Sequence, residues 1–152
     1  MNLPKKKAIK KFIPIYQKVS PVKLMGLVKA FELICGAKFN CQVYTNTQEG
    51  CWIFRYIGAS LIQITIGFHN NTLERDGFIC IYDFSIPHQY KKERIEDRIL
   101  ATIINSVKHW DFEKIVFISK NKDNSELFYR NGFKPKGNGE MSLTLKTLFI
   151  QY

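Results

Sequence analysis

FICIYDFSIP, at residues 78–87, and the apolar run IVFI, at residues 115–118, decide the fold of this chain. Both alternating sets of residues 78–86 are largely apolar, which predicts a strand covered on both faces until its end. From about Lys92 to Lys108, apolar residues recur at helical spacing. The short run at Ile115–Ile118 then closes a strand–helix–strand unit. Because such a crossover joins parallel strands, the sequence predicts an α/β fold with a central parallel pair.

Helices and antiparallel strands are predicted around this unit. Ser20 and Pro21 indicate the start of a helix that ends at Gly36, and Gly26 inside it suggests a close helix contact. Alternating residues from about Cys41 to Ile86 predict antiparallel hairpin strands. Two shorter elements are expected later, a helix at 125–130 and a strand at 141–147. We therefore expect a mixed, twisted sheet with helices on both faces.

Length and composition bound the class of protein. The chain has 152 residues, which suits one domain with its own core, and we expect a basic segment at 1–19 and a single domain at 20–152. The four cysteines show no paired metal spacing, and without a secretory signal we expect reduced thiols in a cytoplasmic protein. The apolar runs are shorter than the roughly 18–20 residues that span a bilayer.

Positive charge is concentrated near the N-terminal end. The chain carries a formal net charge of +10, and residues 1–38 hold nine lysines against one acid, Glu32, for a net +8. Such a cluster can follow phosphates of nucleic acid, of a coenzyme or of a lipid surface. A solvated tail explains it equally well. The lysines that could contact a polyanion are Lys5, Lys6, Lys7, Lys10 and Lys11.

Three stretches carry a resemblance to a known family: the strand end Asp83-Phe84-Ser85-Ile86-Pro87, the following Tyr90-Lys91-Lys92, and Phe128-Tyr129-Arg130-Asn131-Gly132-Phe133. They resemble the GNAT family of acyl-CoA-dependent N-acetyltransferases, over the whole chain in element order and over 78–133 in motifs. The resemblance implies a GNAT-like fold, acetyl-CoA as coenzyme and a small-molecule or protein amine as acceptor. It also implies coenzyme contacts at Phe84, Ser85, Ile86, Lys91, Lys92, Arg94, Asn121 and Phe128.

The sequence departs from the family pattern at two places. In the family, glycines let main-chain N–H groups approach the coenzyme pyrophosphate where this chain has Arg94 and Glu96, and side chains there can obstruct the approach. The general-acid tyrosine position matches Phe128, and Tyr129 is its neighbour, turned by about 100° on a helix. A register shift of one residue would give Tyr129 the role. We therefore predict weak or absent binding of acetyl-CoA.

Two functions remain open from the sequence. The first is acyl transfer to an amine, with Asp83 as general base and Tyr129 as general acid. Asp83 can also be read simply as a polar residue near a strand end. The second function is a non-catalytic protein of the same fold that binds nucleic acid or another polyanion through the N-terminal lysines. The sequence contains no metal-binding motif.

Overall fold

The computed structural model describes residues 18–46, 51–58, 62–70, 77–87, 90, 94–118 and 125–145. Its helices are α2 (Pro21–Cys35), α3 (Ile95–Val107) and α4 (Ser125–Arg130). Its strands are β1 (Phe39–Asn46), β2 (Cys51–Gly58), β3 (Gln63–His69), β4 (Phe78–Ser85), β5 (Lys114–Ile118), β6 (Lys134–Gly137) and β7 (Glu140–Thr144). None of these helices combines the length and the apolar character needed to cross a membrane.

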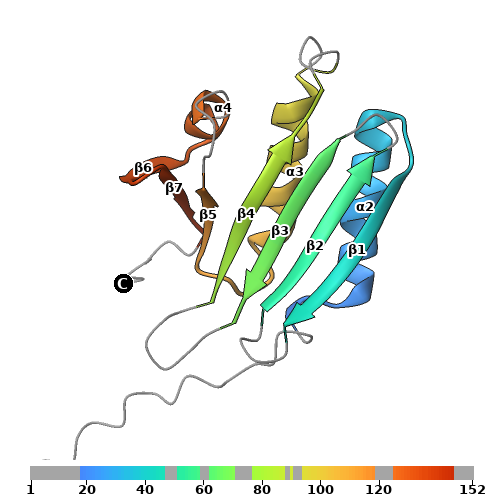
Figure 1. Cartoon of the computed structure of the whole chain (residues 1–152), viewed down its shortest axis with the longest axis horizontal. Coiled ribbons are helices and arrows are strands. Elements are labelled where there is room, and N and C mark those ends of the chain that lie inside the picture. Colours follow the sequence, from blue (N-terminus) through green and yellow to red (C-terminus); the bar gives the residue numbers. More distant parts are fainter. Residues whose placement is uncertain are drawn as a thin grey trace, which may run out of the picture.

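The described strands form one seven-stranded mixed sheet in the order β1-β2-β3-β4-β5-β7-β6 (Figure 1). Strands β1 to β4 are successive antiparallel neighbours. β4 and β5 are parallel, with Phe78 opposite Lys114 and Ile81 opposite Phe117. β5 then pairs with β7, and β7 with β6, in antiparallel register. The predicted antiparallel N-terminal strands and the predicted parallel pair are confirmed.

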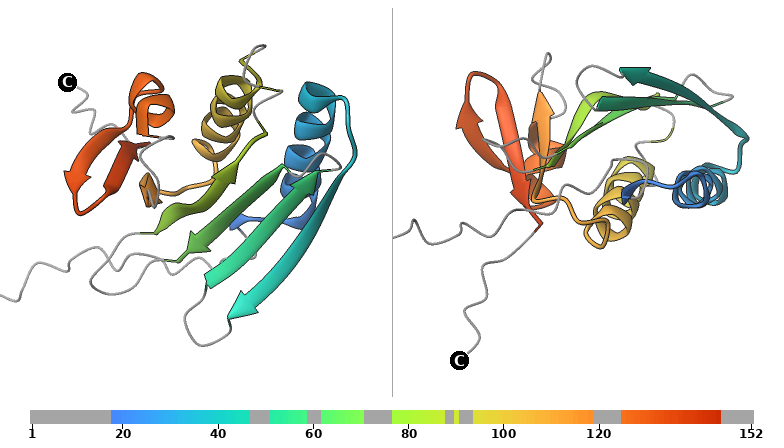
Figure 2. Two further views of the ribbon diagram at one scale, coloured as in Figure 1. Left: turned by 45° about the horizontal axis from the view of Figure 1, so that its top comes forward. Right: turned by 90° about the horizontal axis from the view of Figure 1, so that it is seen from below.

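The core lies between the sheet and the helices. α2 and α3 lie side by side on one face of the sheet (Figure 2) and contact each other. Phe128 of α4 stacks on Phe117 of β5, which belongs to that same core. The predicted mixed α/β sheet with packed helices is confirmed (Figure 2). On the opposite face, β3 and β4 carry polar side chains such as Thr65 and Asp83, which are hydrogen-bonded to each other.

The ends of α2 follow the predicted signals. The Ser20 hydroxyl accepts a hydrogen bond from the backbone N–H of Lys23 at 3.3 Å, and Gly36 ends the helix with φ of 64°. The expectation for Gly26 is corrected, because a Cβ built there meets no described atom within 4 Å and the residue is exposed. Gly26 therefore serves no close contact within the described fold.

Two boundaries differ from the prediction. α3 begins at Ile95 rather than near Lys92, because the preceding Arg94 has a left-handed backbone conformation that is not helical. Strand β6, at 134–137, was not predicted, since the sequence there is polar and contains a proline, and all four residues are exposed. The last predicted strand is present as β7 at 140–144, and residues 146–147 of the prediction lie outside the described residues.

Candidate functional site

The parallel strands β4 and β5 diverge halfway along β4. Their pairing runs only from Phe78 to Ile81, whereas β4 continues to Ser85. A β-bulge marks the same point, because Thr65 of β3 pairs with Asp83 while the next residue of β3 pairs with Ile81. Tyr82 is therefore the extra residue, and a bulge bends its strand. Figure 1 shows β4 leaning away from β5, with α4 beyond the end of β5.

Aromatic rings fill the space where the two strands diverge. The Phe128 ring of α4 stacks on Phe117 of β5, with centroids 3.7 Å apart and planes within 5°. The same ring makes edge contacts with Phe84 of β4 at 5.5 Å and with Phe133 at 5.0 Å. All four side chains are buried. We call these four residues the aromatic cluster, and it fixes the position of α4 against both strands.

The motif after the cluster ties α4 to the start of α3. The Arg130 guanidinium donates from Nε and a terminal nitrogen to the two carboxylate oxygens of Asp97, each at 2.8 Å. The Asn131 side-chain amide donates to the same carboxylate at 3.1 Å, and Arg130 lies 3.8 Å from a Glu96 oxygen. The hydrogen bond from Arg130 lowers the pKa of Asp97. The negative charge of the first turn of α3 is thus offset by Arg130.

The end of α4 explains the remaining residues of the motif. Gly132 has φ of 97°, a conformation that favours glycine. The backbone N–H of Phe133 donates to the Phe128 carbonyl at 3.0 Å, which closes the helix end and returns the chain to the aromatic cluster. In this chain the motif at 128–133 therefore has a structural role: it fills the divergence and holds α3.

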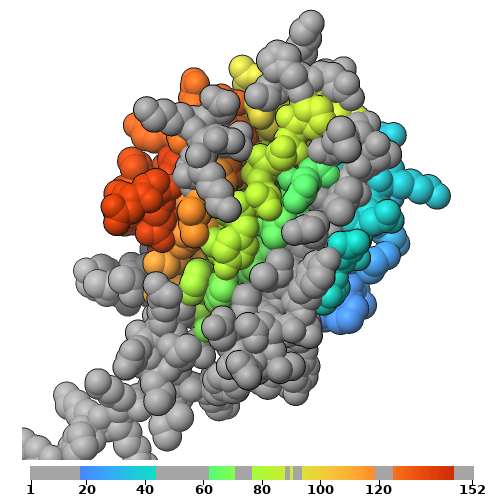
Figure 3. Space-filling model, viewed as in Figure 1, coloured from blue at the N-terminus to red at the C-terminus, as the bar shows by residue number. Residues whose placement is uncertain are grey.

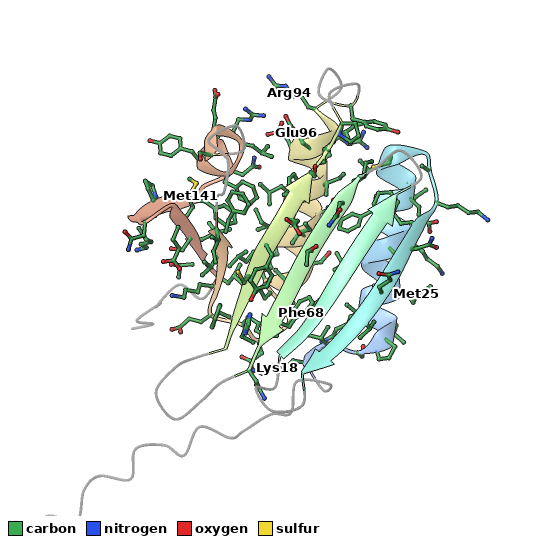
Figure 4. The ribbon with its side chains drawn as sticks, viewed as in Figure 1. Lys18, Met25, Phe68, Arg94, Glu96 and Met141 are labelled. Atoms are coloured by element: carbon green, nitrogen blue, oxygen red, sulfur yellow. The ribbon has the colours of Figure 1, made fainter. Side chains whose placement is uncertain are left out.

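Arg94 adopts a backbone conformation that normally selects glycine. Its φ and ψ are 53° and 33°, and its side chain makes no capping hydrogen bond to α3. The resemblance to the GNAT family matched this position to a glycine. Arg94 thus adopts the left-handed conformation that a glycine would adopt at this position. The first backbone N–H groups of α3, which have no partner within the helix, come immediately after it in the chain. Figure 4 shows Arg94 and Glu96 close together at this end of α3.

We expect Arg94→Gly to raise the free energy of unfolding by about 1 kcal/mol, because an L-residue in the left-handed region costs roughly 1–2 kcal/mol and glycine does not. Arg98→Gly is the matched control, since Arg98 is exposed on the same helix one turn later. That variant should lose about 1 kcal/mol, the cost of glycine inside a helix. Urea unfolding of both variants measures the difference. Equal losses at the two positions would contradict the strained conformation of Arg94.

The face of β3 and β4 that turns away from the aromatic core carries two polar pairs. The Thr65 hydroxyl donates to an Asp83 carboxylate oxygen at 3.2 Å. Farther along, the Tyr82 hydroxyl and His69 Nε2 are 2.7 Å apart. The two rings meet above Gly67, where a Cβ would lie 2.6 Å from the Tyr82 ring. Because of the bulge, the Tyr82 side chain contacts His69 and the Asp83 side chain contacts Thr65.

The His69–Tyr82 pair was not predicted from the sequence. A bulge is set by the pairing of two strands and cannot be read from one of them. The available signal was Gly67, a glycine inside a strand of large residues, which often marks a close approach.

The predicted site residues are only partly brought together. Asp83, Phe84, Ser85 and Ile86 all lie at or just after the divergence, and Phe128 contacts Phe84 there. Tyr129 is 66% exposed, whereas Phe128 is the α4 residue that packs between the strands. Several predicted residues lie outside the described part of the chain: Lys91, Lys92, Asn121, Lys5, Lys6, Lys7, Lys10 and Lys11.

Comparison with known proteins finds similarity only among solved structures. An acetyltransferase of the GNAT family from Staphylococcus aureus Mu50 is 18% identical, with a TM-score of 0.44, over 65% of this chain and 70% of that chain. The GNAT family N-acetyltransferase YhbS from Escherichia coli, in complex with CoA, is 9% identical, with a TM-score of 0.44, over 83% of this chain and 78% of that chain. No family model matches the sequence, and no curated protein matches it.

Proposed function

We propose that this chain binds an acyl-coenzyme A along the main chain of Phe84–Ile86, where β4 no longer pairs with β5, and transfers the acyl group to an amine. The observation that carries the proposal is the divergence itself, because parallel pairing ends at Ile81 and the bulge at Tyr82 turns β4 away from β5. An extended ligand can lie along a strand that has left its neighbour, as in β-strand addition. The sequence resemblance points to the same segment, Phe84–Ile86.

The residues at the start of α3 suit the coenzyme pyrophosphate in their main-chain geometry. Arg94 supplies the left-handed turn and makes no side-chain cap, so the first N–H groups of α3 can face an anion. Asp97 is engaged by Arg130, which reduces the repulsion that its charge would exert on phosphates. The obstruction that remains is the side chains of Arg94 and Glu96. These opposing effects lead us to propose a coenzyme site of low affinity.

When bound, the coenzyme supplies an acyl thioester that an amine can attack. Asp83, at the bulge, would attract the acceptor as an ammonium ion and take its proton, since only the neutral amine carries a lone pair. The Thr65 hydroxyl holds the carboxylate in place for this task. Ser85, which is exposed, and Ile86 would border the acyl chain of the coenzyme. The exposed position of Tyr129 assigns it no contact with the leaving thiolate, whose proton would come from solvent.

Calorimetry with acetyl-CoA and with CoA tests the proposal. We expect the wild-type dissociation constant to lie above about 10 µM, or weaker than roughly −7 kcal/mol, because side chains partly obstruct the main chain of the loop. The double variant Arg94→Gly, Glu96→Gly should bind about tenfold more tightly, and the control Arg98→Gly should bind as the wild type does. Tight wild-type binding would disprove the obstruction and still support acyl transfer. Absence of binding in both the wild type and the double variant would overturn the proposed function.

A further inference from the structure

The outer face of α2 is unusually apolar for a helix at the edge of a fold. Figure 2 shows α2 at the end of the helix layer, with α3 on its inner side, and Figure 3 shows α2 and β1 at one border of the molecule. Val22 is 82% exposed, Met25 53% and Leu33 85%. Figure 4 places Met25 on the side of α2 that faces away from α3. Apolar side chains gathered on one helix face usually mark a surface that another molecule covers.

Most of the charged residues of α2 make contacts within the fold. The helix has three of them, Lys23, Lys29 and Glu32. Lys23 Nζ donates to the Lys18 carbonyl at 2.8 Å and lies over the Trp110 ring. Glu32 accepts a hydrogen bond from the backbone N–H of Phe39 at 3.2 Å. Two of the three charges are therefore used within the fold, and Lys29 is the one that remains exposed among the apolar residues.

We propose that the outer face of α2 packs against α2 of a second copy of this chain. Val22, Gly26, Lys29 and Leu33 follow a 4-3-4 spacing, which places them in one seam along the helix. In an antiparallel pair about a two-fold axis, Val22 lies opposite Leu33, and Gly26 lies opposite Lys29. The large residues then meet each other, and the Lys29 stem crosses the gap that Gly26 leaves, with its ammonium group at the rim.

The position of Gly26 supports this occupant. Glycine inside a helix costs roughly 0.5–1 kcal/mol relative to alanine, yet no described atom lies within 4 Å of a Cβ built at Gly26. Its small size therefore serves no contact within the described fold. A second helix at the usual interaxial distance of about 8–10 Å would use that space.

The size of the face limits the strength of the dimer. A helix of 15 residues is about 22 Å long and about 10 Å wide. The area of that strip is smaller than the roughly 800 Å² per partner that stable complexes bury. We therefore expect the dimer to have a dissociation constant on the order of 10–100 µM. Each copy has a net charge of +10. Screening by salt should therefore strengthen the dimer, whereas it weakens binding to an anionic surface.

Sedimentation equilibrium of the full chain between about 5 and 200 µM, a range that brackets the expected constant, tests the proposal. The weight-average mass should rise from 17.8 kDa toward twice that value. Leu33→Ser should raise the dissociation constant at least about tenfold. Gly26→Leu should do the same, although leucine is the better helix former, so its effect cannot come from a less stable helix. Ile118→Ser, at an exposed apolar residue on β5, is the control and should leave the constant unchanged.

Three results would overturn the proposal. The first is a monomer at every concentration, and the second is a dimer that Leu33→Ser and Gly26→Leu do not weaken. The third is a monomer that binds vesicles of phosphatidylcholine with about 30% phosphatidylglycerol, loses binding in Leu33→Ser, and binds less well as salt rises. That outcome would assign the face to a membrane surface. Coenzyme calorimetry is independent of all three, so the dimer and the proposed acyl transfer can fail separately.

Discussion

Replacing Phe128 with alanine is expected to lower the free energy of unfolding by about 3–5 kcal/mol, the range for truncating a buried phenylalanine. The Phe128 side chain is fully buried, and it is the only member of the aromatic cluster that contacts the other three: Phe84, Phe117 and Phe133. Its removal would leave a cavity between two diverging strands, which cannot close without moving α4. Because α4 also carries Arg130, the variant should loosen the contact with Asp97 at the start of α3.

Tyr129→Ala is the matched control, one residue along the same helix. Its side chain is 66% exposed, so we expect a change within about 0.5 kcal/mol. Chemical denaturation with fluorescence or circular dichroism measures both variants. Similar losses for Phe128→Ala and Tyr129→Ala would mean that α4 is rotated relative to the structure, and Tyr129 would then regain its predicted place beside the strands.

Local patterns predicted most of the fold. The alternation at 78–86, the helical spacing before Lys108 and the apolar run at 115–118 predicted β4, α3 and the parallel β5. Each of these signals is carried by consecutive residues that must bury one face. β6 gave no such signal, because its exposed residues bury no side chain and are held only by pairing with β7.

The site was predicted less well, because its contacts join distant parts of the sequence. The ion pair of Arg130 and Asp97 joins residues 33 positions apart in the sequence. An arginine or an aspartate alone does not indicate which partner it will contact. The match of Arg94 and Glu96 to glycine positions of the GNAT family stays a prediction, and the structure adds the backbone conformation of Arg94. Arg94 keeps the left-handed turn that a glycine would have provided. The acidic charge at the start of α3 is offset at Asp97 by Arg130.

Gly67→Ala should lower the free energy of unfolding by about 2–3 kcal/mol, through overpacking and a broken hydrogen bond. A Cβ at Gly67 would lie 2.6 Å from a carbon of the Tyr82 ring and 3.2 Å from His69 Nε2. The ring has little freedom to move away, because the Tyr82 hydroxyl is 2.7 Å from His69 Nε2 and His69 is itself stacked on Phe78 at 4.6 Å. The alanine must therefore displace Tyr82 from His69.

Gly26→Ala is the matched control, because it adds the same methyl group to a glycine that has no described atom near its Cβ position. It should raise the free energy of unfolding by about 0.5–1 kcal/mol through helix propensity. Both variants are measured well below the expected dimer constant, so that association through α2 does not contribute. Tyr82→Phe, which removes only the hydroxyl, then separates the hydrogen bond from the overpacking. If Gly67→Ala is as well tolerated as Gly26→Ala, Tyr82 does not lie over Gly67, and the bulge places its side chain elsewhere.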